Sequence, residues 1–324
     1  MDPKFSVLIP THNRADVLSY AIESVLAQSE SSFELLVVGD GCSDNTAEVV
    51  ASYTDDSRVH WYDFPKAHGF GYANRNKALR DARGRYIAFL GHDDIYFPDH
   101  LEILGRHLDE NSEINAVYSR PLWVDVGGEV IPSPWNLNDP QMYEYFFTER
   151  NEIPALCFLY RAELHEQIGY WDETIEKAGD WDLWKRVIQA KPGKSFAFEP
   201  TPTGLHFKAN WKTSSKIVPS RLWEILKFLR DSQVIPPELC IDSSAGPSQQ
   251  HVFWDELKVN PENLTRRIRS GAVQLLDNIC QIQFPLALEN AARRKREKDA
   301  FAARAAKLKK TIEASAGPRA GRSA

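Results

Sequence analysis

Two adjacent aspartates, Asp93 and Asp94, follow an apolar run that ends at Leu90. Neighbouring carboxylates at the end of a strand repel each other unless a cation neutralises them, and carboxylate oxygens are ligands that Mg²⁺ and Mn²⁺ prefer. The pair therefore indicates a site for a divalent metal ion. Taken alone, the pair also allows another interpretation, in which one aspartate caps the following helix and the other is solvated.

A third aspartate, Asp40, lies between Gly39 and Gly41 at the end of an earlier apolar run. An acid in such a turn can accept hydrogen bonds from a nucleotide base or a ribose, because the glycines let a ligand approach the backbone closely. A tight turn with a helix cap is the other interpretation. The sequence contains neither GxGxxG nor GxxxxGK[ST], which argues against the usual dinucleotide-binding loop and against a P-loop.

Asp180 stands at the predicted start of a helix that carries Leu183 and Trp184. At helical spacing the acid and the apolar pair lie on different faces, so the carboxylate can point into a cleft while the apolar face anchors the helix. This arrangement suits a general base, which must be held within reach of the proton that it accepts. A role as helix N-cap is the alternative, and it is compatible with catalysis.

Two further side chains carry positive charge or a titratable ring. Arg75 lies near the start of a predicted helix, where it can reach a diphosphate together with the helix N–H groups; a plain surface position is the alternative. His206 follows the last predicted strand, with Lys208 and Lys212 close by in the sequence, and can complete a metal or phosphate site.

Short apolar runs alternate with segments of helical periodicity up to about residue 215, which predicts a parallel, doubly wound α/β sheet. Ligands bind beyond the carboxyl ends of the strands in such sheets, and the loops that carry Asp40 and Asp93 lie at that edge. The predicted strands are Phe5–Ile9 and residues 33–38, 58–64, 85–90, 116–118 and 155–160, and the predicted helices are residues 15–28, 47–53, 74–83 and 181–189.

The pattern changes after about residue 215, where helical segments replace the alternation. We therefore expect a first domain over residues 1–215, a helical C-terminal subdomain over 216–285, and a basic helix with a disordered tail over 286–324. Two interpretations of the basic helix stay open. It docks on an anionic membrane surface, or it is a solvated or oligomerising helix.

The composition is that of a globular protein: 324 residues, 43% hydrophobic and 26% charged, with a net charge of -6. That charge gives no overall attraction for nucleic acid, which we exclude as a partner. The four cysteines form no CxxC pair and indicate neither a zinc knuckle nor a disulfide framework. With no apolar run near 20 residues and no signal-peptide pattern, we expect a cytoplasmic protein, at most peripheral to the inner face of a membrane.

The order and spacing of these segments resemble those of the family 2 inverting glycosyltransferases of the GT-A fold. The resemblance implies a Rossmann-like, mixed but mostly parallel sheet flanked by helices, with a helical C-terminal extension. It also implies transfer of a sugar, of the hexosyltransferase type, from a nucleoside-diphosphate sugar to a glycan or a lipid-linked saccharide, as in surface polysaccharide synthesis. The segments that carry it are Phe5–Arg14, Ser24–Gln28, Phe33–Thr46, Ala73–Asn76, Gly84–Leu90, His92–Asp94, Leu164–Glu173 and Gly179–Trp184.

The same resemblance implies a role for each candidate residue. Asp94 would bind the Mn²⁺ or Mg²⁺ that bridges the diphosphate, and Asp180 would be the catalytic base that accepts the proton of the acceptor hydroxyl. His206 is the second metal ligand that we expect, from its residue type and not from the resemblance. Thr11 and Asp40 would contact the nucleotide base, and Asp93 the ribose or the metal's hydration shell. The implied nucleotide-binding residues are Pro10, Thr11, Asn13, Asp40, Arg75 and Asp93.

Three glycines depart from the family pattern. Gly39, Gly91 and Gly179 each stand where the family usually has a further acid, and these departures put sugar-nucleotide choice and metal affinity in doubt. They motivate the alternative of a binding protein without turnover, which the retained Asp94 and Asp180 oppose. A sugar nucleotidyltransferase is the other alternative, and the absence of a glycine-rich, basic phosphate loop after the first strand argues against it.

Overall fold

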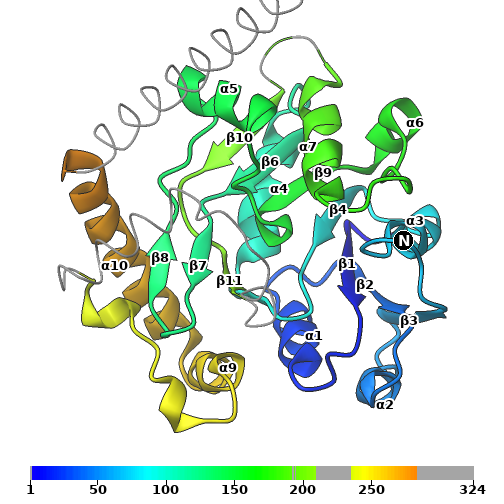
Figure 1. Ribbon diagram of the computed structural model, residues 1–324, viewed down its shortest axis with the longest axis horizontal. Coiled ribbons are helices and arrows are strands. Elements are labelled where there is room, and N and C mark those ends of the chain that lie inside the picture. The colour runs from blue at the N-terminus through cyan, green and yellow to red at the C-terminus, as the bar shows by residue number, and fades with distance from the viewer. Residues whose placement is uncertain (1, 192, 194, 209–234, 283–324) are drawn as a thin grey trace, which may run out of the picture.

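The main sheet of the computed structural model contains seven strands (Figure 1). The structure describes residues 2–191, 193, 195–208 and 235–282. Across the sheet the order is β10 (Phe196–Glu199), β6 (Ala116–Ser119), β9 (Phe158–Arg161), β4 (Tyr86–Phe89), β1 (Phe5–Thr11), β2 (Phe33–Asp40) and β3 (Val59–Phe64). Only β9 runs antiparallel to its neighbours in this sheet, so the expected mixed, mostly parallel sheet is confirmed.

The centre of this sheet is apolar on both faces. Every residue of β2 is buried, and β1 pairs with β2 on one side and with β4 on the other. Continuous apolar runs are typical of parallel strands covered by helices on both faces. The chain moves outward from β1 to β3 and then returns to β4 on the opposite side of β1, which makes the β1/β4 boundary the topological switch point where ligands bind in such folds.

Four of the observed helices agree with the predicted ones to within a few residues, and three more, over residues 100–110, 140–148 and 165–168, were not predicted. In the first of these, α4, Leu101, Leu104 and Leu108 form a buried stripe at helical spacing. The predicted strand over 155–160 is wrong at its start, because Ala155–Cys157 forms a 3-10 turn after Pro154 and only then does β9 begin. The helices are α1 (Leu18–Leu26), α2 (Thr46–Ala51), α3 (Tyr72–Arg80), α4 (His100–Glu110), α5 (Pro140–Thr148), α6 (His165–Ile168) and α7 (Gly179–Gln189).

A second, four-stranded sheet was not predicted. Its order is β5 (Ile95–Tyr96), β11 (Gly204–Phe207), β7 (Leu122–Val124) and β8 (Val130–Pro132). Strands of two to four residues are too short to show a period-2 pattern. The sheet matters for function because β5 begins directly after Asp94 and β11 contains His206, and these two strands pair antiparallel.

The described part of the C-terminal region packs on this second sheet. Helices α9 (Gln249–Val259) and α10 (Pro261–Ile282) lie beside β7, β8 and β11 (Figure 1), and they share one hydrophobic core with them. The predicted division near residue 215 and the basic helix of 286–324 lie outside the described residues, so the domain boundaries stay a prediction. Within the described ranges, no helix has the length and apolar character needed to span a bilayer. The core contains Ile95, Phe97, Leu122, Val124, Phe207, Phe253, Trp254, Leu264 and Ile268 among others.

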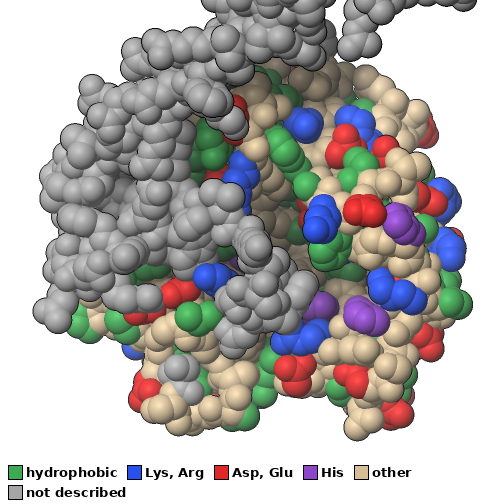
Figure 2. Space-filling model, in the orientation of Figure 1, with side chains coloured by type: hydrophobic (Ala, Val, Ile, Leu, Met, Phe, Trp, Pro, Cys, Tyr) green, Lys and Arg blue, Asp and Glu red, His purple; other side chains and the backbone are tan. Residues whose placement is uncertain are grey.

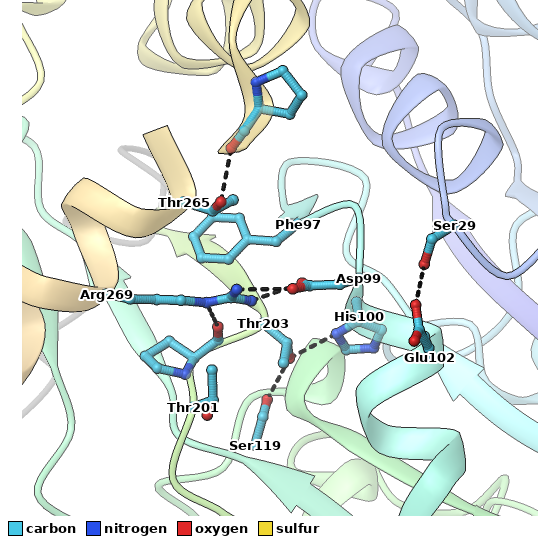
Figure 3. Close-up of polar contacts among 12 residues, drawn as sticks. Ser29, Phe97, Asp99, His100, Glu102, Ser119, Thr201, Thr203, Thr265 and Arg269 are labelled. Atoms are coloured by element: carbon cyan, nitrogen blue, oxygen red, sulfur yellow. Dashed lines mark hydrogen bonds and ion pairs between the residues drawn. The ribbon is translucent and has the colours of Figure 1, made fainter. Parts of the chain in front are cut away.

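Polar contacts fix α10 to the loop after β5 (Figure 3). The Arg269 guanidinium donates two hydrogen bonds to the Asp99 carboxylate, at 2.7 and 2.8 Å, and a third to the carbonyl of Pro202 at 3.0 Å. Beneath them, His100 Nδ1 lies 2.8 Å from Thr203 Oγ1. The His100 ring stacks on Tyr96 and is 1% exposed, and this burial lowers its pKa to about 3.

His100 predicts a pH dependence of stability. The folded protein keeps His100 neutral down to about pH 3, whereas the unfolded chain takes up a proton near pH 6.5, so the unfolded state binds more protons in between. This contribution to stability is complete above pH 6.5 and is lost as the pH falls, by about 2 kcal/mol between pH 7 and pH 5. Urea denaturation of the wild type and of His100→Gln at both values should give a smaller loss for the variant; equal losses would contradict a neutral, buried His100.

Candidate active site

Two adjoining cavities open where β1, β2 and β4 end. The first, of about 450 Å³, contains Thr11 and Asp40 in its wall, and the second, of about 350 Å³, contains Asp94 and Asp180. Figure 2 shows histidine and basic side chains around a hollow on the face where β1 ends. All nine residues that the sequence singled out line one or both cavities. The residues shared by both walls are Pro10, Phe70, Arg75 and His92.

Asp40 organises the loop between β3 and α3. Its Oδ1 accepts hydrogen bonds from the Ala67 N–H and the Asn74 amide, both at 2.8 Å, and its Oδ2 pairs with Lys66 Nζ. Gly71 has a φ of 75°, and a Cβ at that position would lie 2.7 Å from this carboxylate, so only glycine fits there. Because its partners are Lys66, Ala67 and the Asn74 side chain, the Asp40 carboxylate does not cap a helix. It holds the wall of the first cavity in place.

The loop after β1 supplies the opposite wall. Thr11 Oγ1 is buried and has no hydrogen-bond partner among the described residues. Asn13 adopts a left-handed backbone with a φ of 51°, and its Oδ1 accepts a hydrogen bond from the Ser43 N–H at 2.7 Å. Between them, His12 Nδ1 donates to the Asp40 carbonyl at 2.8 Å, which ties the end of β1 to the end of β2.

Asp94 and His206 meet although they are 112 residues apart in the chain. Asp94 Oδ2 lies 2.9 Å from His206 Nδ1, and Asp94 Oδ1 accepts a hydrogen bond from the Phe207 N–H at 3.0 Å. The His206 ring rests edge-on against Trp123 at 4.6 Å. Asp94 makes no helix-cap bond, so the capping interpretation fails for it. The antiparallel pairing of β5 with β11 brings the two residues together.

Asp93 contacts two distant parts of the chain. Its carboxylate lies 3.6 Å from Arg14 Nη1, and its carbonyl accepts a hydrogen bond from the Gln250 amide of α9 at 3.1 Å. The C-terminal helices thus reach the same loop that carries Asp94.

Asp180 projects from the first turn of α7 into the second cavity. The N-cap of this helix is Ala178, which has a left-handed backbone with a φ of 61°, so Asp180 is not the cap. Asp180 Oδ1 accepts a hydrogen bond from Trp171 Nε1 at 3.1 Å and lies 3.4 Å from Arg75 Nη1. Arg75 is only 14% exposed and is therefore not a plain surface residue.

Asp94 and His206 are the pair best placed to hold a divalent cation. One carboxylate and one imidazole give an oxygen and a nitrogen ligand, which suits Mn²⁺ better than Mg²⁺. Over the ranges that the structure describes, no group of three or more His, Cys, Asp or Glu side chains has a metal-binding arrangement. A diphosphate and water would have to provide the other ligands, as is usual where a cation binds together with a phosphate substrate.

The chain matches the model of the glycosyl transferase family 2 over residues 6–169, about half of its length. It belongs to this family. An uncharacterized glycosyltransferase of Methanocaldococcus jannaschii is 30% identical over 192 residues, which make up 57% of this chain and 65% of that protein. TuaG of Bacillus subtilis, a glycosyltransferase named for teichuronic acid biosynthesis, is 39% identical over 101 residues, or 31% of this chain and 40% of TuaG. The aligned part is thus less than two thirds of either relative.

Solved structures agree with the fold. Staphylococcus aureus TarS, residues 1–349 in complex with UDP-GlcNAc, superimposes with a TM-score of 0.54 at 19% identity, covering 77% of this chain and 69% of that one. At this identity the likeness concerns the fold alone. The expected GT-A fold of family 2 glycosyltransferases is confirmed.

In this family 2 chain, other side chains fill the space beside each of the three unusual glycines. A Cβ on Gly39 would lie 2.5 Å from the Trp61 ring, and a Cβ on Gly179 would lie 2.5 Å from the Tyr72 ring. A Cβ on Gly91 would lie 2.6 Å from the Asp94 carboxylate. At two of the three positions, therefore, an aromatic ring occupies the volume into which a further acid would project.

Several residues that line the cavities are not among those predicted from the sequence. His12 and His92 lie inside the segments that carry the family resemblance. Their positions in these segments could therefore have indicated that they line the site. Lys66 and Phe70 follow β3 in a loop with no local signal. Among the aromatic residues between 122 and 154, Trp135 and Phe146 are buried in the interior, and Trp123 packs on His206.

The contact between Gly39 and Trp61 gives a stability prediction. Gly39→Ala puts a methyl group against a rigid ring, so we expect the free energy of unfolding to fall by about 1–3 kcal/mol. In a Trp61→Phe background the shorter ring leaves room, and the same change should cost clearly less. Urea denaturation of the four proteins measures the difference, and equal losses in both backgrounds would show that Trp61 is not the obstacle.

Proposed function

We propose that this family 2 glycosyltransferase moves a sugar from a nucleoside-diphosphate sugar to a hydroxyl group of an acceptor, with inversion at the anomeric carbon. The observation that carries the proposal is that Asp180, Asp94 and His206 line one cavity, which adjoins the cavity of Thr11 and Asp40. Together the two cavities can hold a nucleotide-sugar donor along their length. The leaving group and the sugar of the donor would then lie next to Asp94 and Asp180.

The first cavity is proposed to bind the nucleoside. Thr11 Oγ1, buried and without a partner among the described residues, is suited to hydrogen-bond a base, and Asp40 keeps the opposite wall in place. Asp93 lies toward the second cavity, where a ribose would follow the base. The UDP-GlcNAc complex of TarS, a protein of the same fold, supports a uridine nucleotide as the first donor class to test.

The proposed cation, Mn²⁺ or Mg²⁺, would be held by Asp94 and His206. When bound, it would stabilise the negative charge that develops on the departing diphosphate. Within the chain, the Phe207 N–H holds Asp94 Oδ1, which leaves Asp94 Oδ2 and the neighbouring His206 ring as the atoms that would face the cation.

Asp180 is proposed to be the general base. It takes the proton of the acceptor hydroxyl while that oxygen forms a bond to the anomeric carbon, and the bond from that carbon to the diphosphate oxygen breaks on the opposite face. The products are an inverted glycoside, a nucleoside diphosphate and a protonated carboxyl. Holding donor, acceptor and base together can supply about 7–11 kcal/mol of the barrier reduction.

A glycan or lipid-linked saccharide stays the proposed acceptor, and the name of TuaG supports surface polysaccharide synthesis as its context. Membrane contact and oligomer formation through residues 286–324 stay predictions, because that segment lies outside the described residues. A binding protein without turnover is less well supported, since Asp180 faces the cavity that contains Asp94.

Asp94→Ala tests the metal site. Wild-type protein with UDP and Mn²⁺ at 100 times the dissociation constant should gain about 2.7 kcal/mol, which raises its melting temperature by several degrees. The variant should lose the part of this increase that depends on Mn²⁺. A panel of nucleoside diphosphates and nucleotide sugars, each measured with Mn²⁺ and with EDTA, gives the comparison, and a variant that still responds to Mn²⁺ would place the metal elsewhere.

Asp180→Asn tests the base. The amide keeps the shape of the carboxylate but cannot accept the proton, so we expect donor binding to remain and transfer to fall by at least about 100-fold. The matched control is Asp182→Asn, on the same helix, where the acid pairs with Arg186 and does not line the cavity. Release of nucleoside diphosphate in the presence of acceptor measures transfer. Full activity of Asp180→Asn, or an equal loss in Asp182→Asn, would argue against the assignment.

A further inference from the structure

The two oxygens of the Asp180 carboxylate have different surroundings. Oδ1 accepts a hydrogen bond from Trp171 Nε1 at 3.1 Å and faces Arg75 Nη1 at 3.4 Å. Oδ2 has no hydrogen-bond partner among the described residues. A carboxylate held by one oxygen presents the other in a fixed direction, and here that oxygen belongs to a residue that lines the cavity.

The Trp171 indole is itself held firmly. Its backbone N–H donates to Asn76 Oδ1 at 3.1 Å, and its carbonyl accepts from Asn76 Nδ2 at 2.9 Å, so α3 clamps the main chain at this point. The ring packs against Phe89 at 4.8 Å and is 3% exposed. With backbone and ring both fixed, the indole N–H has one direction in which to point.

The second donor, Arg75, depends on the same ring. Its guanidinium lies over the Trp171 ring at 5.2 Å and over the Tyr72 ring at 5.0 Å, an arrangement in which the aromatic faces attract the cation. Tyr72 also accepts a hydrogen bond from the Gly179 N–H, at 2.9 Å, and a Cβ on Gly179 would lie 2.5 Å from its ring. The start of α7 is therefore fixed by Tyr72, in the volume where the family usually has a glutamate side chain.

We infer that Trp171 is a positioning residue for Asp180: its indole N–H, supported by Arg75, holds Oδ1 so that Oδ2 faces the acceptor hydroxyl. This inference rests on the proposed role of Asp180 as the base. Trp171 is also part of the wall of the second cavity, and in this scheme it acts on transfer through Asp180. At position 171, a side chain needs a donor at the far end of a large ring to hydrogen-bond Asp180 Oδ1. Phenylalanine fills much of the same space but has no N–H group.

The experiment is Trp171→Phe, assayed with the donor that stabilises the wild type. Loss of a hydrogen bond to a charged group should lower kcat about 10- to 100-fold, while KM for the donor stays within about two-fold. The donor-induced rise in melting temperature should equal that of the wild type. In an Asp180→Asn background the same substitution should cause little further loss, because the carboxylate that it positions is gone.

Trp184→Phe is the matched control. Trp184 is also a buried indole packed on Phe89, at 5.4 Å, but its Nε1 faces the Ile153 carbonyl and not Asp180. It should leave kcat unchanged within about two-fold. The inference is overturned if both variants lose activity equally. It is also overturned if Trp171→Phe lowers kcat as much in the Asp180→Asn background as in the wild type, because the effect is then one of packing.

The role of Trp171 and the role of Asp180 can be overturned separately. Transfer by the wild type that Asp180→Asn abolishes and Trp171→Phe leaves intact would overturn the role of Trp171 and keep the proposed function. Undiminished transfer by Asp180→Asn would overturn the assignment of the base, and with it the reason for positioning that residue.

Discussion

Pairing of charges across element boundaries holds this cleft together. Four carboxylates converge at one edge of the sheet, where burial strengthens their mutual repulsion. Each has a basic or imidazole partner from another segment, so the attraction that offsets this repulsion also joins a loop to a strand or a helix to a helix. The pairs are Asp40 with Lys66, Asp93 with Arg14, Asp94 with His206, and Asp180 with Arg75.

Gly39 and Gly179, which stand where the family usually has acids, are consistent with this pairing of acids and bases. An added carboxylate at position 39 or 179 would bring a further negative charge to an edge where the four bases named above are already paired. Trp61 and Tyr72 occupy those volumes instead, and Tyr72 joins Arg75 and Asp180 into one network. The absence of these acids has thus been accommodated by packing, and the absence alone is a weak sign of lost activity.

The sequence predicted the centre of the fold well, because long, fully apolar strands followed by polar loops have a strong local pattern. It also selected nine residues that all line the two cavities. What could not be predicted depends on distant pairing. The second sheet is made of very short strands, and the contact between Asp94 and His206 depends on two of them. Arg75 was expected at a diphosphate, yet its neighbours in this structure are Asp180 and the Trp171 ring. Trp171 comes from a segment without a helical or strand period, so its contact with Arg75 could not be predicted from the sequence.

The C-terminal helices have a bearing on how the cleft comes into being. Strands β5 and β11, beside Asp94 and His206, owe much of their burial to α9 and α10, and Gln250 holds the main chain at Asp93. During synthesis the sheet of residues 5–199 can form while these helices are still missing, but the walls around Asp94 would then lack their apolar backing. A nascent chain would thus have a Rossmann-like core well before it had a finished cleft, and a fragment cut near residue 208 would not be a smaller version of the enzyme.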